Sequence, residues 1–211
     1  MLITDRGSRR PTRWQVRVLA ASVALLWLAP HAGAQRMVPS VPPPTQPMEA
    51  SLPARSMAPA LDATVVTGEY SVMYDFPRLD LYLSRTAGHL HAAVVADTRG
   101  WVAVGLGSHL MDGSRIMFGF VVDRGPVFVE QVGTDHEHTD TEQPLQAEAA
   151  VGEVGRRTTL EVRVPWAAVE PLLQDDVLLP VITAYGTQDS LTQIHRFQRT
   201  VVARLEPGAP D

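Results

Sequence analysis

The sequence of 211 residues lacks cysteine and lysine, so all 18 of its basic residues are arginine. The absence of cysteine excludes disulfide bonds, cysteine-ligated zinc, iron–sulfur clusters and a catalytic thiol. The absence of lysine excludes a Schiff-base lysine, the lysine of a phosphate-binding P-loop and lysine as a metal ligand. Any chemistry of this chain therefore depends on its other side chains.

Long hydrophobic runs are lacking as well, apart from a short one near the N-terminus. Residues 18–29 form an uncharged, largely apolar run of 12 residues, after a basic region at 5–17 and before Ala32-Gly33-Ala34. This order is typical of a secretory signal peptide, here over residues 1–34. The run is too short to cross a bilayer, which takes about 20 apolar residues. We therefore expect a periplasmic or secreted protein that does not span a membrane after the signal is cleaved.

Positive charge is concentrated in that N-terminal segment. Arg9 and Arg10 hint at the twin-arginine export route, but Pro11-Thr12-Arg13 follow them where such signals usually carry apolar residues, so we expect the Sec route. The formal net charge of the whole chain is −5, and the residues after position 34 contain 13 basic and 22 acidic residues. Phosphate binding requires clustered positive charge, so we expect no nucleic-acid partner.

Three further regions follow the signal. Residues 35–60 are rich in proline, which predicts a disordered linker outside the fold. Residues 61–207 are expected to form one folded domain, and 208–211 a disordered tail. The order of short segments separated by turn residues predicts an antiparallel β-sandwich or barrel.

The strand pattern is clearest at residues 78–83, where apolar and polar residues alternate strictly. A short helix is expected at 165–170 because Pro165 suits a first helical turn. The polar stretch 134–146 is expected to be a loop or an edge. Further strands are predicted at 89–96, 101–106, 115–122, 126–132, 158–164, 177–185 and 196–205.

Three short motifs bear a specific resemblance. They are Gly-Trp-Val-Ala-Val-Gly at 100–105, Met-Asp-Gly-Ser at 111–114 and a late histidine, His195, near the start of the last predicted strand. In this order they resemble the DOMON domain family. The resemblance implies an all-β, immunoglobulin-like antiparallel sandwich with one short helix. Some members bind b-type haem through a methionine and a histidine, as in the cytochrome domain of cellobiose dehydrogenase, whereas others bind sugars or accompany redox domains.

The resemblance implies that Met111 and His195 are axial ligands of haem b. Ligation on both sides leaves no open position for a substrate, which suits single-electron transfer to a redox partner protein or a membrane electron-transfer component, without enzyme activity. Without cysteine, the haem could not be attached covalently. Met111 as a core filler and His195 as an ordinary strand residue stay open, with His109 and Met117 as nearby substitutes.

The resemblance also implies apolar cover for the haem and a cation for its propionates. The candidate cofactor-binding residues are Trp101, Phe118, Phe120, Tyr185, Arg196 and Phe197, with Arg115 and Arg199 as other possible propionate partners.

The sequence is also compatible with two other functions. A haem-free sandwich that binds a sugar or a protein would present an exposed aromatic platform, for which Trp101 and Trp166 are candidates. A zinc or copper site could use the His-x-His pairs His89/His91 and His136/His138. No third ligand is visible in the sequence, so a surface-facing strand pair for the first and a solvated polar loop for the second are the preferred explanations. No nucleophile elbow, P-loop or dinucleotide-binding glycine motif is present.

Overall fold

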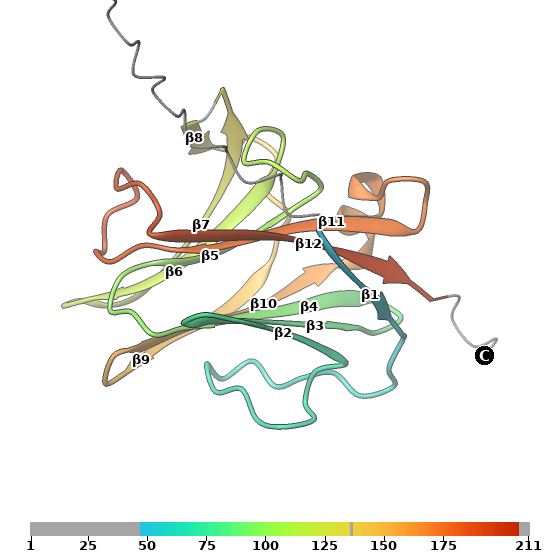
Figure 1. Ribbon diagram of the computed structural model, residues 1–211, viewed down its shortest axis with the longest axis horizontal. Coiled ribbons are helices and arrows are strands. Elements are labelled where there is room, and N and C mark those ends of the chain that lie inside the picture. Colours follow the sequence, from blue (N-terminus) through green and yellow to red (C-terminus); the bar gives the residue numbers. More distant parts are fainter. Residues whose placement is uncertain (1–46, 136, 207–211) are drawn as a thin grey trace, which may run out of the picture. The chain divides into compact units, whose positions relative to one another are not determined.

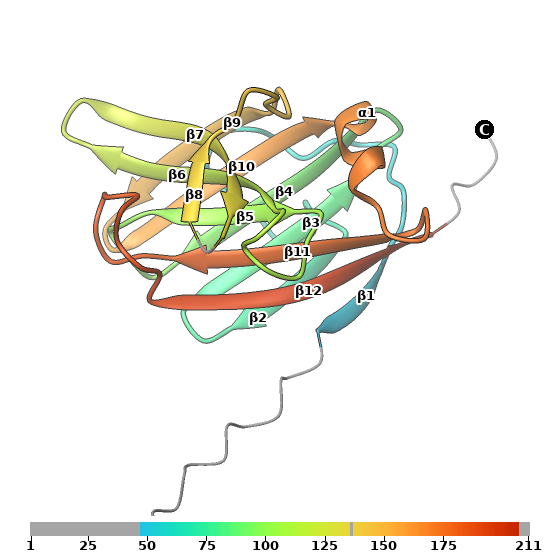
Figure 2. The same cartoon turned by 90° about the horizontal axis from the view of Figure 1, so that it is seen from above.

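The computed structural model describes residues 47–135 and 137–206, and these form two packed β-sheets (Figures 1 and 2). The first sheet has seven strands in the order β1 (Met48–Leu52), β12 (Phe197–Leu205), β11 (Leu178–Tyr185), β5 (Val102–Leu106), β6 (Arg115–Val122), β7 (Gly125–Thr134) and β8 (Glu137–Asp140). The second has five, in the order β2 (Val72–Phe76), β3 (Leu79–Arg85), β4 (His89–Ala96), β10 (Arg157–Pro165) and β9 (Glu148–Val154). The predicted all-β sandwich is confirmed.

Side-chain alternation produces the core between the sheets. In β3, Leu79, Leu81 and Leu83 point inward and are at most 1% exposed, whereas the residues between them face outward. Successive side chains of a strand lie on opposite faces, so each sheet has an inner face in the core and an outer face. The predicted helix is also present, as α1 (Trp166–Val169) followed by a 3-10 turn at Glu170–Leu172.

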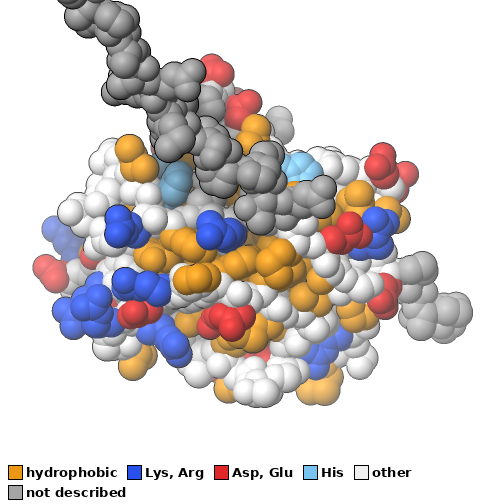
Figure 3. All heavy atoms as spheres, viewed as in Figure 1, with side chains coloured by type: hydrophobic (Ala, Val, Ile, Leu, Met, Phe, Trp, Pro, Cys, Tyr) orange, Lys and Arg blue, Asp and Glu red, His pale blue; other side chains and the backbone are white. Residues whose placement is uncertain are grey.

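On the side of the sandwich seen in Figure 3, hydrophobic side chains form a band between the two sheets. Here β2 and β12 border the core. The rings of Phe76 in β2 and Phe197 in β12 lie 6.2 Å apart, and Phe197 stacks on Tyr185 at 5.7 Å. Aromatic side chains therefore close this side of the core.

The boundary of the predicted linker is wrong. Residues Met48–Leu52 form β1, which pairs in parallel with β12 from Met48 opposite Val201 to Leu52 opposite Leu205. Leu52 is fully buried in the core. The strand was missed because it lies between proline-rich flanks and buries only one of its five side chains, so pairing with a distant strand rather than a local pattern orders it. The predicted signal peptide, the first part of the linker and the C-terminal tail lie outside the described residues.

Two more strands, β2 and β9, were not predicted, and the polar stretch includes the edge strand β8. In β2, Tyr74 and Phe76 point inward, but the run is only five residues long. In β9, only two of the seven residues, Val151 and Val154, are β-branched, and the others are alanine, glycine and glutamate, which are less frequent in strands. All the other predicted strands are present, with boundaries shifted by at most a few residues.

A segment of the chain covers the outer face of the second sheet, below β2 and β3 in Figure 1. Glu161 of β10 faces outward yet is fully buried. Its carboxylate accepts hydrogen bonds from the backbone N–H groups of Asp62 (3.0 Å) and Ala63 (2.6 Å) and from the Tyr70 hydroxyl (3.0 Å). Burial raises the pKa of Glu161, although these hydrogen bonds oppose the shift. One buried carboxylate thus attaches the covering segment to the sheet.

Within the described residues, no helix has the length and hydrophobicity needed to cross a membrane.

Candidate functional site

The outer face of the first sheet carries a pocket of about 730 Å³. This volume lies within the ~300–1,000 Å³ that is usual for cofactor and small-molecule sites. Its floor is made by outward-facing residues of β5, β6 and β11 and by Trp101 just before β5. The floor residues are Trp101, Ala103, Gly105, Ile116, Phe118, Ile182 and Ala184.

Small residues on β5 make the floor hollow. Val102, Val104 and Leu106 fill the core on the inner face, whereas Ala103 and Gly105 face the pocket. A Cβ at Gly105 would lie 2.6 Å from Cγ1 of Ile182, so any larger residue would force the Ile182 side chain to move. The alternation of large and small residues in the Gly-Trp-Val-Ala-Val-Gly motif therefore packs the core and opens the pocket at once.

Met111 lines the pocket from the loop between β5 and β6. Its carbonyl accepts a hydrogen bond from the Ser114 N–H at 3.0 Å, and the Gly113 N–H donates to the Gly133 carbonyl of β7 at 3.0 Å. A Cβ at Gly133 would lie 1.8 Å from the Met111 carbonyl oxygen and 3.2 Å from its Cγ. The loop thus packs directly against Gly133 of β7, and this contact fixes where Met111 enters the pocket.

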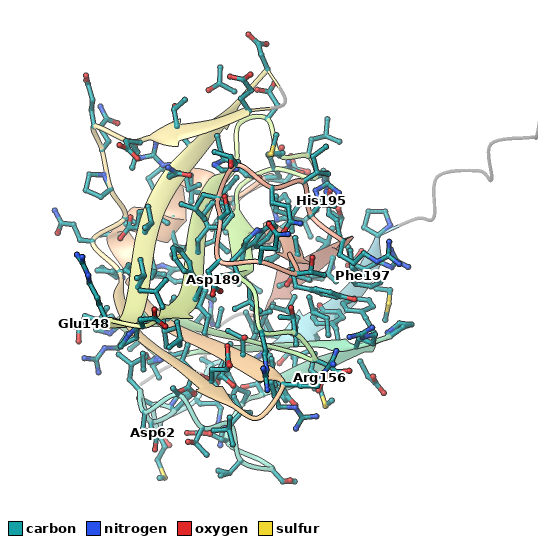
Figure 4. The ribbon with its side chains drawn as sticks, turned by 90° about the vertical axis from the view of Figure 1, so that its left-hand side faces the viewer. Asp62, Glu148, Arg156, Asp189, His195 and Phe197 are labelled. Atoms are coloured by element: carbon teal, nitrogen blue, oxygen red, sulfur yellow. The ribbon has the colours of Figure 1, made fainter. Side chains whose placement is uncertain are left out.

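His195 lines the same pocket from the loop between β11 and β12. The residue is solvent-exposed, and Figure 4 shows it farther from the second sheet than Phe197, two positions along the chain. The two predicted ligands, 84 positions apart in the sequence, are therefore brought to one pocket from two different loops.

Other predicted site residues divide between the two faces of the sheet. Trp101 and Phe118 line the pocket, with rings 5.4 Å apart in an edge-on arrangement. Phe120 belongs to the same outer apolar cluster but does not line the pocket. Tyr185 and Phe197 pack in the core on the inner face, which corrects the expectation that they cover a cofactor. Along their strands, these two residues alternate with the pocket-lining residues, so their side chains point to the opposite face of the sheet.

The arginines proposed for propionate contacts do not line the pocket. Arg196 is exposed and directly follows His195. The Arg115 guanidinium donates to the Gln143 carbonyl, and that of Arg199 lies 4.3 Å from the centre of the Phe197 ring. Each of the three directly adjoins a pocket-lining residue in the sequence: Ile116, His195 and Gln198, respectively, for Arg115, Arg196 and Arg199.

The two substitute ligands are excluded from the pocket lining. Met117 is fully buried in the core between the sheets, because it points to the inner face of β6. The backbone carbonyl of His109 accepts a hydrogen bond from the Thr200 hydroxyl at 3.0 Å, but its side chain does not line the pocket.

A histidine that was not predicted at this site, His138 of β8, also lines the pocket. Its ring lies 4.9 Å from that of Phe118, and its Nδ1 lies 2.5 Å from Oε1 of Gln131. Burial lowers the pKa of His138, while a hydrogen bond with the Leu191 backbone and the nearby Glu137 oppose that shift. The alternation around His138 was a strand signal, but the surrounding acidic residues suggested a solvated loop.

The other histidine pair differs from the surface-facing pair that was expected. His91 is 3% exposed, and its Nε2 lies 3.3 Å from the Thr86 hydroxyl. Burial, together with the charges of His89 and Arg163, lowers its pKa to about 4. Across residues 47–135 and 137–206, no three or more histidine, aspartate or glutamate side chains gather as a metal site would require. His136 lies outside the described residues.

The two tryptophans proposed as a sugar-binding platform lie apart. Trp101 is 4% exposed and belongs to the outer cluster of the first sheet. Trp166 of α1 packs against the core, with the Arg85 guanidinium 5.5 Å from its ring centre. They form no common exposed surface.

Comparison with solved structures shows related folds. The cytochrome domain of cellobiose dehydrogenase from Myriococcum thermophilum is similar with a TM-score of 0.51 and 13% identity, over 66% of this chain and 84% of that one. The cytochrome b domain of pyranose dehydrogenase from Coprinopsis cinerea gives 0.46 and 13%, over 60% and 76%. A family 9 carbohydrate-binding module from Caldicellulosiruptor kristjanssonii, in complex with glucose, gives 0.47 and 10%, over 77% and 97%.

The first of these likenesses confirms the predicted resemblance to the DOMON family at the level of the fold. The chain is a DOMON-like β-sandwich. No protein-family model matches the sequence. A search of curated proteins likewise finds no match.

Proposed function

We propose that this protein is an exported, b-type haem-binding module that transfers single electrons, with Met111 and His195 as the axial ligands of the iron. One observation carries the proposal: the pocket on the outer face of the first sheet receives both side chains, each from a different loop. Both residues belong to sequence motifs that resemble those of the DOMON family, a resemblance that is independent of the pocket.

The residues of the pocket suit a haem. A thioether and an imidazole are a known ligand pair for iron in electron-transfer haems, and the thioether raises the reduction potential. Trp101, Ile116 and Phe118 offer an apolar surface to the ring. The chain has no cysteine, so packing and the two ligands would hold the group. Haem would supply the one-electron chemistry, and the protein would supply binding, orientation and exclusion of water.

The exposure of His195 is consistent with electron exchange at the surface. Its loop borders the pocket and faces solvent, so a partner could approach without opening the sandwich. We propose a redox partner protein or a membrane electron-transfer component as the donor or acceptor. With both axial positions filled, the module by itself would catalyse no reaction. The expected signal peptide would direct it to the periplasm or the exterior.

An absorption spectrum of the purified protein, reconstituted with haem, tests the proposal. We expect a sharp Soret band and resolved α and β bands on reduction, as in a six-coordinate low-spin haem. Met111→Ala and His195→Ala should each remove the low-spin spectrum, because each removes one axial ligand. Met73→Ala and His89→Ala are matched controls, since both residues lie in the second sheet. A protein that binds no haem, or ligand variants with the wild-type spectrum, would refute the proposal.

A further inference from the structure

The loop that carries Met111 is attached to the first sheet at two separate places. On one side it packs against β7, where the Gly113 N–H donates to the Gly133 carbonyl at 3.0 Å and Met111 occupies the space of a Gly133 side chain. On the other side it reaches β12, where the Thr200 hydroxyl donates to the His109 carbonyl at 3.0 Å. The strands β11, β5 and β6 lie between β12 and β7, so the loop reaches across three intervening strands.

Hydrogen bonds inside the loop connect Met111 to the residue that Thr200 holds. The Ser114 hydroxyl donates to the Leu110 carbonyl at 2.6 Å, and the Ser114 N–H donates to the Met111 carbonyl at 3.0 Å. The Leu110 N–H in turn donates to the Ser108 hydroxyl at 3.1 Å. Because these bonds make the loop one compact unit, a displacement at residue 109 is transmitted to Met111, two positions along the chain.

Thr200 stands on the face of β12 that carries the pocket. Gln198, two positions earlier in the strand, lines the pocket, and alternate residues of a strand point to the same face. Thr200 is also directly opposite Ile182, a residue of the pocket floor. Thr200 itself is half-buried and does not line the pocket, so its hydroxyl acts on the loop and not on a bound group.

The same strand fixes the position of the second proposed ligand. β12 begins at Phe197, two positions after His195, and its pairing with β11 starts with Phe197 opposite Tyr185. The Arg196 N–H donates to the Tyr185 carbonyl at 2.8 Å, which extends this attachment to the residue next to His195. β12 is therefore attached to both of the segments that carry the proposed ligands.

We propose that Thr200 is a positioning residue, whose hydroxyl holds the Met111 loop against β12 and so sets the separation of Met111 from His195 across the pocket. This inference rests on the proposed function only for the role of the two side chains as iron ligands. The attachment of the loop to β12 is a property of the protein without haem. A hydroxyl outside the pocket would thus influence how strongly the iron is ligated.

Two substitutions separate the hydrogen bond from the packing of Thr200. Thr200→Val keeps the branched shape of the side chain but removes the hydroxyl, so the His109 carbonyl loses its donor. Thr200→Ser keeps the hydroxyl and removes the methyl group instead. Thr159→Val makes the same chemical change on β10 of the second sheet and is the matched control. A role of the hydroxyl requires that Thr200→Val alone disturbs Met111.

NMR of the haem-free, full-length protein with isotope-labelled methionine methyl groups tests the attachment. The Met111 signal is identified by its loss in Met111→Ala. In Thr200→Val we expect this signal to shift toward the position of free methionine and to sharpen, because the loop has lost one of its two attachments. In Thr200→Ser and Thr159→Val it should stay at its wild-type position. The signal of Met73, in the second sheet, should be unchanged in every variant, which also shows that the fold is intact.

Haem-loaded samples supply the second readout. Thr200→Val should weaken haem binding about fivefold, which corresponds to ~1 kcal/mol for one lost hydrogen bond. Its reduction potential should fall and a high-spin fraction should appear, because a displaced thioether binds the iron less well and thioether ligation raises the potential. Thr200→Ser should restore the affinity, the potential and the low-spin spectrum.

The outcomes separate the role of Thr200 from the proposed function. If the wild type binds no haem while Thr200→Val still shifts the Met111 signal, the proposed function fails and the positioning of Met111 by Thr200 stands. An unchanged Met111 signal in Thr200→Val, or an equal disturbance by Thr200→Ser, would overturn the role of the hydroxyl. A shifted Met111 signal with wild-type haem affinity and potential would show that the hydroxyl does not set the ligation, and would overturn the proposal as well.

Discussion

The outer faces of the two sheets are covered in different ways. Across the second sheet, a segment of the chain itself lies over β10 and is attached through the buried Glu161. Over the first sheet, the Met111 loop and the His195 loop border a pocket of about 730 Å³. Both faces carry a buried or half-buried histidine, His91 on one and His138 on the other.

This difference in covering distinguishes polar groups that stabilise the fold from polar groups that belong to a binding site. On the second sheet, the carboxylate of Glu161 faces three hydrogen-bond donors from the covering segment. On the first sheet, apolar floor residues meet a thioether and imidazoles in a hollow that no segment of the described chain fills. Changes to the second sheet should therefore alter stability, and changes to the first should alter binding.

The largest expected effect is on the covered face. Glu161→Ala removes the acceptor of two backbone N–H groups and the Tyr70 hydroxyl. We therefore expect the free energy of unfolding, measured by urea denaturation, to fall by about 3 kcal/mol. Hydrogen exchange should speed up at 60–70. Haem affinity should stay within about twofold of the wild type, and a larger change would show that the two faces are coupled. Glu153→Ala, on β9, is the control.

On the pocket face, Gly133→Ala should weaken haem binding by about 100-fold, or ~2.7 kcal/mol. The added Cβ would meet the Met111 carbonyl at 1.8 Å, so the loop with the proposed ligand must move. Titration with haem measures the affinity, and urea unfolding of the same sample checks that the fold survives. Gly88→Ala is the control, because nothing lies within 4 Å of its Cβ position. Unchanged affinity in Gly133→Ala would exclude Met111 as a ligand placed by this contact.

The buried histidine of the covered face should make stability depend on pH. The pKa of His91 is lowered from 6.5 to about 4, so between these values the unfolded chain binds a proton that the folded chain does not. Stability should therefore fall as the pH drops through this window, by about 2 kcal/mol between pH 7 and 4. In His91→Gln that loss should shrink markedly in urea unfolding measured at each pH. If His91→Gln loses as much stability on acidification as the wild type does, other titratable groups cause the loss.

The smallest expected effect concerns Arg196, which directly follows His195 in the sequence. The residue is exposed, and a charge contact in solvent contributes only ~0–1 kcal/mol. Arg196→Gln should thus weaken haem binding by at most about threefold, with the difference disappearing at high salt. Arg204→Gln, on the same strand but near its other end, serves for comparison. A loss of more than tenfold would give Arg196 a direct role in holding the group.

The sequence alone predicted the class of fold, and it also named the two residues that are proposed as ligands. The alternation at 78–83 predicted β3, and turn residues separated most of the other strands, because these signals are local. Tyr185 and Phe197 were assigned to the wrong face because aromatic character alone does not say which side of a sheet a residue occupies. The face that a residue occupies depends on whether it stands at an odd or an even position of its strand, and on the register of that strand in the sheet.

Met111 and His195 could be named without a structure because the short motifs that contain them resemble those of the DOMON family, some of whose members bind haem through a methionine and a histidine. Their meeting at one pocket, the place of His138 beside them and the inclusion of β1 in the sheet depended on tertiary structure. The reason is physical: pairing between β1 and β12 and between β5 and β11, and the path of two loops, join residues far apart in the chain. Local composition carries no record of such long-range contacts.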